Sequence, residues 1–189
     1  MTGMNILFIN ACVREESRTL VLAHRLLERL QGQVTELRLG EMDLKPLTGP
    51  SLARRDELLQ KGLLDDPSLA LARQFAQADC IVAAAPYWDL GFPALFKIYL
   101  ELVTVSGVSF YYQNGRPRGL CRAKTLYYVT TAGGPVAEDF GFAYLESLAR
   151  NLYGIGQTRC LRAENLDMEG ADVARLLKEA METFDQEGL

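Results

Sequence analysis

The chain lacks the cysteine spacings that structural zinc sites and redox dithiols use. Its four cysteines, Cys12, Cys80, Cys121 and Cys160, lie far apart and include no Cys-x-x-Cys pair. Such sites need closely repeated ligands, so the spacing argues against both kinds. We expect no metal site, and we expect Cys80 and Cys160 to be small core residues because they lie in apolar runs.

A long apolar run and a strong charge of either sign are also missing. No stretch approaches the ~20 apolar residues that a membrane span needs. The start, MTGMNILFIN, has no basic segment followed by a long apolar one, as a secretory signal would. The formal net charge is only −4, which argues against a surface for nucleic acid or an anionic membrane. We therefore expect a reduced, soluble, cytoplasmic protein with no nucleic-acid and no membrane partner.

Histidine is nearly absent, which limits the acid–base chemistry available to the side chains. The one histidine, His24, lies in a segment with helical spacing, and we expect it to be a surface residue rather than a catalyst. The composition, 49% hydrophobic and 23% charged, is typical of a globular protein. We expect residues 1–189 to form a single domain, which at this length buries roughly 70% of the surface of the unfolded chain.

Short apolar runs alternate with segments of helical spacing along the whole chain. This alternation is typical of a parallel sheet with helices on both faces, so the predicted fold class is α/β, a three-layer α/β/α sandwich. We interpret the polar stretch 40–65 as an insertion with one short helix that forms a mobile surface flap. The spacing predicts strands over 4–10, 33–39, 80–85, 125–134 and 158–165, and helices over 18–32, 66–78, 93–107, 138–154 and 171–184.

Three loops are the places to look for a ligand site. Parallel α/β sheets bind ligands beyond the carboxyl ends of their strands, which selects loops 11–19, 84–93 and 130–137. The first loop, ACVREESRT, contains neither GxGxxG nor GxxxxGK followed by Ser or Thr. The first loop therefore matches neither the fingerprint of dinucleotide-binding sites nor the phosphate-binding loop of nucleoside-triphosphate enzymes.

The first loop instead places Ser17, Arg18 and Thr19 directly before a predicted helix. Two hydroxyl groups, unpaired backbone N–H groups and the positive end of the helix dipole together suit a phosphate. The alternative is that Ser17 is only the N-cap of the helix, which is a common role for serine.

The other two loops offer a flat surface and exposed backbone. PYWDLGFP carries Tyr87 and Trp88 and suits a planar heteroaromatic ring; the alternative is that both side chains pack in the core or at a subunit interface. TTAGG supplies hydroxyl groups, and Gly133 and Gly134 allow a ligand to approach the backbone closely; the alternative is a plain turn. A phosphate at the first loop and a ring between the other two is the arrangement that FMN would need.

With these loops in place, the chain resembles the flavodoxin-like NAD(P)H dehydrogenase (quinone) and FMN-dependent NADH-azoreductase family. The resemblance covers roughly residues 4–166 and is most specific in PYWDLGFPALFKIYLELVTVSGVSFYY, NGRPRGL and TLYYVTTAGG. It implies a five-stranded parallel sheet in the order 2-1-3-4-5. It also implies FMN contacts at Ser17, Arg18, Thr19, Pro86, Tyr87, Trp88, Asp89, Leu90, Thr131, Ala132, Gly133 and Gly134.

The resemblance further implies a homodimer with two sites at its interface. Phe110 and Tyr112 would then belong to the substrate pocket. Three positions depart from the family's pattern: Ala11 stands where a further phosphate-binding serine is common, Asp89 replaces an asparagine, and Ala132 replaces an arginine of some azoreductases.

The implied activity is a transfer of hydride from NADH or NADPH through FMN to quinones, azo compounds or related aromatic acceptors, by a ping-pong mechanism. No side chain is expected to be catalytic, because the flavin carries the reaction. Two alternatives are a flavodoxin-type one-electron carrier, which typically has a TxTGxT-like phosphate loop that this chain lacks, and a flavin-binding sensor without turnover.

Overall fold

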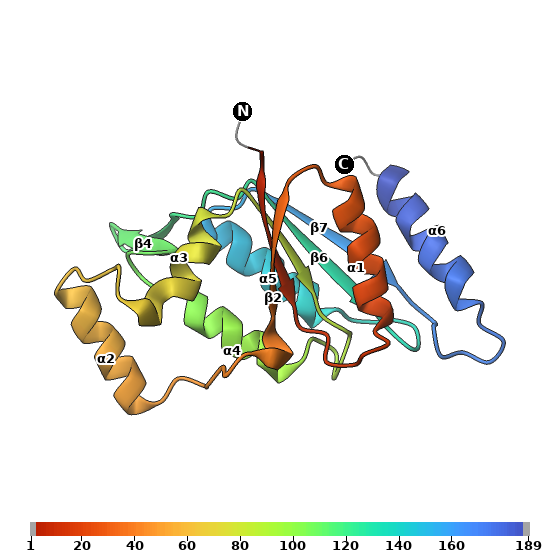
Figure 1. Cartoon of the computed structure of the whole chain (residues 1–189), viewed down its shortest axis with the longest axis horizontal. Coiled ribbons are helices and arrows are strands. Elements are labelled where there is room, and N and C mark those ends of the chain that lie inside the picture. Colours follow the sequence, from red (N-terminus) through yellow and green to blue (C-terminus); the bar gives the residue numbers. More distant parts are fainter. Residues whose placement is uncertain (1–2, 187–189) are drawn as a thin grey trace.

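The computed structural model describes residues 3–186, and its regular elements alternate as the sequence predicts (Figure 1). The strands are β1 (Asn5–Asn10), β2 (Gln33–Arg38), β3 (Cys80–Ala84), β4 (Phe110–Gln113), β5 (Arg116–Gly119), β6 (Thr125–Thr131) and β7 (Gln157–Ala163). The helices are α1 (Arg18–Arg29), α2 (Gly49–Gln60), α3 (Ala70–Gln77), α4 (Ala94–Val103), α5 (Phe140–Leu148) and α6 (Val173–Gln186). Among residues 3–186, none of the helices is long and apolar enough to cross a lipid bilayer.

Five of the strands form one parallel sheet in the order β2-β1-β3-β6-β7. This is the predicted order 2-1-3-4-5 of the five parallel strands, and the predicted three-layer architecture is confirmed. Helices α1 and α6 cover one face of the sheet, while α3, α4 and α5 cover the other (Figure 1). Because parallel strands need a crossover after each strand, all their carboxyl ends meet at one edge.

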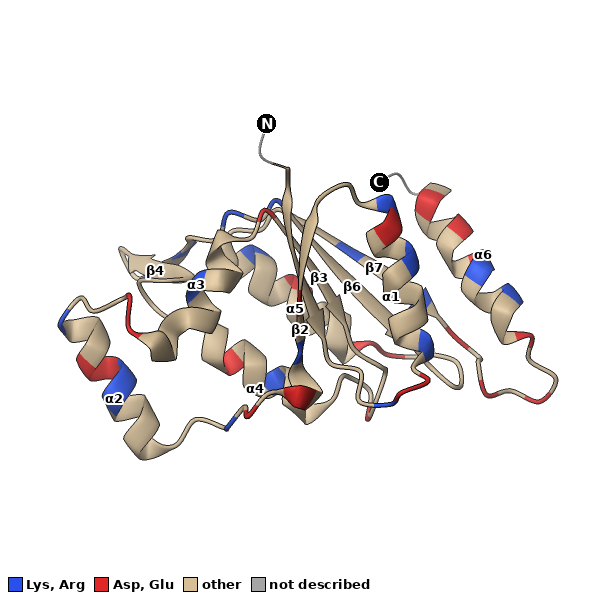
Figure 2. Cartoon of the chain, viewed as in Figure 1, with Lys and Arg blue, Asp and Glu red and all other residues tan. Residues whose placement is uncertain are grey.

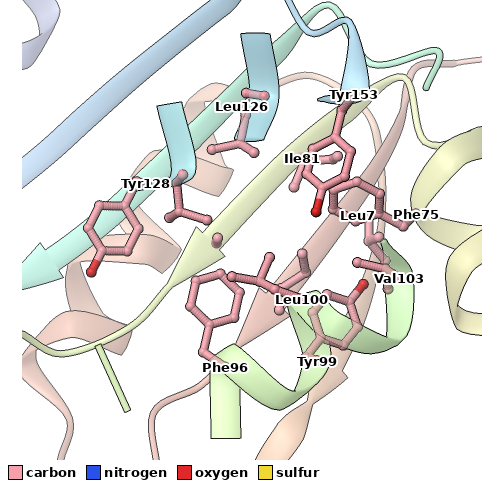
Figure 3. Close-up of a cluster of buried hydrophobic side chains, with 14 of the residues drawn as sticks. Leu7, Phe75, Ile81, Phe96, Tyr99, Leu100, Val103, Leu126, Tyr128 and Tyr153 are labelled. Atoms are coloured by element: carbon pink, nitrogen blue, oxygen red, sulfur yellow. The ribbon is translucent and has the colours of Figure 1, made fainter. Parts of the chain in front are cut away.

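Apolar side chains pack against both faces of this sheet. The larger cluster joins strand residues such as Ile81 and Leu126 to aromatic rings from the covering helices (Figure 3). Among these rings, Phe75 and Tyr153 meet edge to face with centroids 4.9 Å apart. Cys80 is buried in the cluster on the opposite face, as its apolar neighbours predict.

The polar stretch 40–65 does contain a helix, α2, which lies away from the sheet (Figure 1). Thr48 caps it through its side chain, and within this helix Leu58 alone is buried. Met42 and Leu44, which precede the helix in the sequence, nevertheless pack against the larger core cluster. The interpretation of the whole stretch as a surface flap was therefore wrong for these two residues, which belong to the packed body of the protein.

The segment after α4 differs most from the prediction. The helix predicted over 93–107 ends at Val103, where the Thr104 hydroxyl donates a hydrogen bond to the Leu100 carbonyl at 2.6 Å. The chain then forms an antiparallel hairpin, β4–β5, whose turn residues Asn114 and Gly115 have φ angles of 53° and 74°. Asn-Gly is the pair that such a two-residue turn favours, but the four-residue strands are too short and too exposed for their apolar pattern to predict them.

The hairpin is held against the body of the protein through Gly119. A Cβ atom at Gly119 would lie 2.1 Å from the backbone carbonyl oxygen of Tyr153. The Tyr153 carbonyl also accepts a hydrogen bond from the Cys121 N–H at 3.3 Å. The two backbones therefore approach closely at a point where a side chain does not fit.

We expect Gly119→Ala to lower the free energy of unfolding by about 2 kcal/mol or more, because the added methyl group meets backbone that has to move. The control is Gly156→Ala, where a Cβ atom would have no neighbour within 4 Å. Urea denaturation followed by circular dichroism measures both variants. Equal stability of the two variants would contradict the close approach.

Candidate functional site

A cavity of about 490 Å³ opens at the carboxyl edge of the sheet, within the range of small-molecule sites. Its walls come from the loops after β1, β3, β6 and β7. The sequence selected the first three of these loops. The structure brings together these predicted residues in the lining: Ser17, Arg18, Thr19, Pro86, Tyr87, Trp88, Thr131, Ala132 and Gly133.

Five predicted residues do not line this cavity. Asp89, Leu90 and Gly134 adjoin lining residues in the sequence, whereas Phe110 and Tyr112 lie on β4, in the separate hairpin. Their rings contact each other with centroids 5.5 Å apart, and Tyr112 is exposed. Within one chain, these two aromatics are therefore not part of the cavity.

The loop before α1 presents unpaired backbone donors. Within the described part of the chain, the N–H groups of residues 13–16, 18 and 19 form no hydrogen bond, and residues 15 and 16 form a turn before the helix. The Oγ atom of Ser17 accepts the Leu20 N–H at 3.2 Å, so Ser17 is the N-cap of α1 and also lines the cavity. The two interpretations of Ser17 are therefore compatible. Unpaired N–H groups at the start of a helix form a binding site for an anion.

Thr19 and Thr131 are buried hydroxyl residues that join two walls of the cavity. They are only 1% and 8% exposed, and their Oγ1 atoms form a hydrogen bond of 2.6 Å. One hydroxyl donates and the other accepts in this bond. The loop after β1 and the end of β6 are fixed together at this point.

Arg18 joins the first loop to the loop after β7. Its Nη1 atom donates to the Asp167 carboxylate at 2.6 Å and to the Leu166 carbonyl at 3.0 Å. Asp167 in turn lies over Gly133, where a Cβ atom would be 2.2 Å from its Oδ2 atom. A side chain at position 133 would therefore have to displace the Asp167 side chain.

The first loop is also held from the strand side, by Asn10. The Asn10 Oδ1 atom accepts the Cys12 N–H at 2.9 Å, and its Nδ2 atom donates to Glu36 on β2, also at 2.9 Å. Ala11 is fully buried, and its N–H donates to the Ala84 carbonyl at 2.8 Å. Position 11 thus faces the interior, away from the lining.

The loop after β3 forms a tight turn over 88–91. Trp88 and Gly91 exchange two backbone hydrogen bonds of 3.2 and 2.8 Å, and the central residues Asp89 and Leu90 have φ angles of 51° and 63°. Two consecutive positive φ angles define a type I′ turn. A leucine in this region is uncommon and costs of order 1–3 kcal/mol. The turn keeps Trp88 half-buried in the wall and leaves Asp89 and Leu90 exposed.

Tyr87 connects this loop to the loop after β6. Its hydroxyl donates to the Glu138 carbonyl at 2.6 Å, and its N–H donates to the Thr131 carbonyl at 3.0 Å. Tyr87 is therefore fixed at both its backbone and its side chain.

Sequence reasoning missed several lining residues. The rule that selected the other three loops also applies to the loop after the strand predicted over 158–165, and it would have found Leu166 and Asp167. The first loop itself adds Cys12, Val13, Arg14 and Glu16 to the lining. Burial raises the pKa of the Cys12 thiol to about 11, so this thiol is protonated at neutral pH.

Charges of both signs lie on the first loop (Figure 2). Arg14, Glu15 and Glu16 are exposed, and Arg18 is paired with Asp167.

His24 is exposed on α1, as predicted, and it does not line the cavity. Among residues 3–186, no group of three or more His, Cys, Asp or Glu side chains is arranged to hold a metal ion.

Known proteins are similar to this chain in sequence. A family model described as "Flavodoxin-like fold" matches residues 4–187. An FMN-dependent NADH:quinone oxidoreductase of Lachnoclostridium phytofermentans is 31% identical over 187 residues, covering 94% of each chain. The FMN-dependent NADH:quinone oxidoreductase 2 of Clostridium acetobutylicum is 31% identical over 190 residues, again covering 94% of each chain.

Solved structures share the fold at lower sequence identity. An azoreductase from Bacillus anthracis superposes with a TM-score of 0.78 at 19% identity, covering 97% of each chain. An FMN-dependent NADH-azoreductase of the same organism, solved in complex with FMN, has a TM-score of 0.77 at 17% identity and the same coverage. The chain therefore belongs to the flavodoxin-like fold family, as its loops after β1, β3 and β6 indicate.

Proposed function

We propose that this protein is an FMN-dependent oxidoreductase that takes electrons from NADH. The observation that carries the proposal is one cavity that joins unpaired N–H groups before α1 to the Tyr87–Trp88 turn and to Gly133. The curated relatives named above, which match this chain along 94% of its length, support the same cofactor and donor.

The residues present fit FMN. The N–H groups of residues 13–16, 18 and 19 would hold its phosphate at the N-terminus of α1, with Ser17 beside them. Pro86, Tyr87 and Trp88 would lie along the flat ring on one side, and the segment from Thr131 to Gly133 on the other. The flavin supplies the electron-transfer chemistry when bound. The chain binds it, orients it, and leaves one side of the open cavity for a second molecule.

Donor and acceptor would use this open side in turn, by a ping-pong mechanism. Quinones, azo compounds and related aromatic acceptors are the proposed substrate class, because Tyr87 and Trp88 offer flat apolar surface at the cavity. NADPH is a second possible donor. The cytoplasmic location stays a prediction from the sequence.

We also propose that the protein acts as a homodimer. Leu90, Phe140 and Tyr144 form an apolar rim beside the turn at 88–91 and are 52%, 57% and 38% exposed. The Phe140 N–H donates to the Leu90 carbonyl at 3.1 Å, so the rim is continuous. Tyr112 on β4 is also exposed. A second copy would cover such surface and bring Phe110 and Tyr112 to a cavity that they do not line within one chain.

The purified protein is expected to bind FMN and to be reduced by NADH. Added FMN should lose its fluorescence on binding, and anaerobic NADH should bleach the bound flavin within seconds and over repeated cycles once a quinone is supplied. A protein that takes up no FMN would overturn the proposal. Flavin that binds but is not reduced by NADH or NADPH would favour a flavodoxin-type one-electron carrier or a flavin-binding sensor without turnover.

The phosphate assignment is tested by two changes at Ser17. Ser17→Asp and Ser17→Asn both keep a good N-cap, so α1 should stay stable in each. The aspartate places a negative charge beside the proposed phosphate and should weaken FMN binding by at least about tenfold relative to the asparagine. Fluorescence titration with FMN and with riboflavin, which has no phosphate, measures the effect. Equal FMN affinity of the two variants would show that the phosphate does not bind at this loop.

The homodimer is tested by Phe140→Asp, which places a charge in the apolar rim. Aspartate suits the first turn of α5, so the chain should still fold. We expect the dimer to dissociate at concentrations where the unchanged protein stays associated, as measured by analytical ultracentrifugation. The control is Val21→Asp on the exposed surface of α1, which should not change the mass. A monomeric unchanged protein would contradict the proposal.

A further inference from the structure

Arg162 on β7 joins two carboxylates behind the loop that follows β6. Its Nη1 atom lies 2.9 Å from Asp139 Oδ2, and its Nε atom lies 2.8 Å from Glu164 Oε1. The side chains of Arg162, Asp139 and Glu164 are only 34%, 11% and 28% exposed. The cluster is thus partly shielded from water, where its charges interact more strongly than on an open surface.

Each of these carboxylates also holds a backbone N–H group with its second oxygen atom. Asp139 Oδ1 accepts the Phe142 N–H at 2.8 Å and caps α5. Glu164 Oε2 accepts the Val136 N–H at 2.9 Å. Through these two carboxylates, one guanidinium group fixes the loop and the start of the helix that follows it.

The segment 133–139 that is fixed in this way reaches the cavity at both its ends. At one end Gly133 lines the cavity, and its carbonyl accepts the Asp167 N–H at 2.9 Å. At the other end the Glu138 carbonyl accepts the Tyr87 hydroxyl at 2.6 Å. This segment therefore connects the wall at Gly133 to the side chain of Tyr87.

We propose that Arg162 is a positioning residue for the bound flavin. It touches neither the cavity nor any group that would react, but it keeps Asp139 and Glu164 together and so holds segment 133–139 in place. Without the guanidinium group, two partly buried carboxylates face each other with no compensating charge. They separate, and segment 133–139 shifts with them, which moves Gly133 and the carbonyl group that accepts the Tyr87 hydroxyl. The effect on flavin rests on the proposed function, whereas the effect on the loop does not.

The test compares Arg162→Gln and Arg162→Lys with Arg175→Gln. Arg175 is a matched control because it pairs with Glu179 on the exposed surface of α6 at 2.8 Å, away from the cavity. Arg162→Gln should weaken FMN binding by about tenfold and change the visible circular dichroism of the bound flavin. Arg162→Lys restores one charge but not the fork that spans two carboxylates, so it should recover part of the affinity while the spectrum stays altered.

Loss of stability alone would not produce this pattern. Gly32→Ala serves as the comparison, because a Cβ atom there would lie 2.4 Å from the Met4 carbonyl oxygen, at the edge of the sheet opposite the cavity. It is expected to destabilise the fold and should leave the spectrum of the bound flavin unchanged. If Arg162→Gln keeps the affinity and the spectrum of the unchanged protein, the positioning role is wrong. It is also wrong if Gly32→Ala alters the spectrum to the same extent.

A second measurement needs no cofactor. In the flavin-free protein, amide hydrogen exchange at Val136 and Phe142 should be faster in Arg162→Gln than in the unchanged protein, and Arg175→Gln should show no difference. Unchanged exchange at both amides would overturn the inference. If the unchanged protein binds no FMN, the proposed function fails, and the exchange rates still decide whether Arg162 holds the loop.

Discussion

All five strands of the main sheet run in the same direction, and the site depends on this constraint. Each strand has to be followed by a crossover that returns the chain to the opposite edge, so every strand delivers its next loop to the same side. That side receives residues from the loops at 12–19, 86–88, 131–133 and 166–167. The hydrogen bond between Thr19 and Thr131 is a direct result, since it joins loops that are more than a hundred residues apart in the chain.

The polar side chains around the cavity mostly satisfy one another. Ser17 caps its own helix, Thr19 bonds to Thr131, and Arg18 pairs with Asp167. Within residues 3–186, the backbone N–H groups of residues 13–16, 18 and 19 by contrast form no hydrogen bond. Backbone donors cannot change rotamer, so a site built from them is organised before a ligand arrives, and binding requires little further ordering.

The parts of this architecture that sequence predicted are those governed by local pattern. Apolar runs such as 4–10 specify buried strands, and their alternation with helices specifies a parallel sheet and hence its ligand edge. The parts that it missed depend on contacts between distant segments. The local sequence does not distinguish Arg162 from any other strand residue. Its role follows from its contacts with Asp139 and Glu164, which only the folded chain brings together. The hairpin at β4–β5 is too short and too exposed to have an apolar pattern, and its residues Phe110 and Tyr112 do not line the cavity within one chain.

The origin of the cavity walls has a consequence for how the protein is made. One wall begins at Cys12, while another consists of Leu166 and Asp167, which follow the last strand of the sheet. A chain still being synthesised lacks that second wall until β7 has emerged and paired with β6. Any ligand of this cavity therefore finds its complete site only after the chain as far as Asp167 has left the ribosome. Since that ligand binds the folded chain and not the unfolded one, it stabilises the entire sheet rather than one loop.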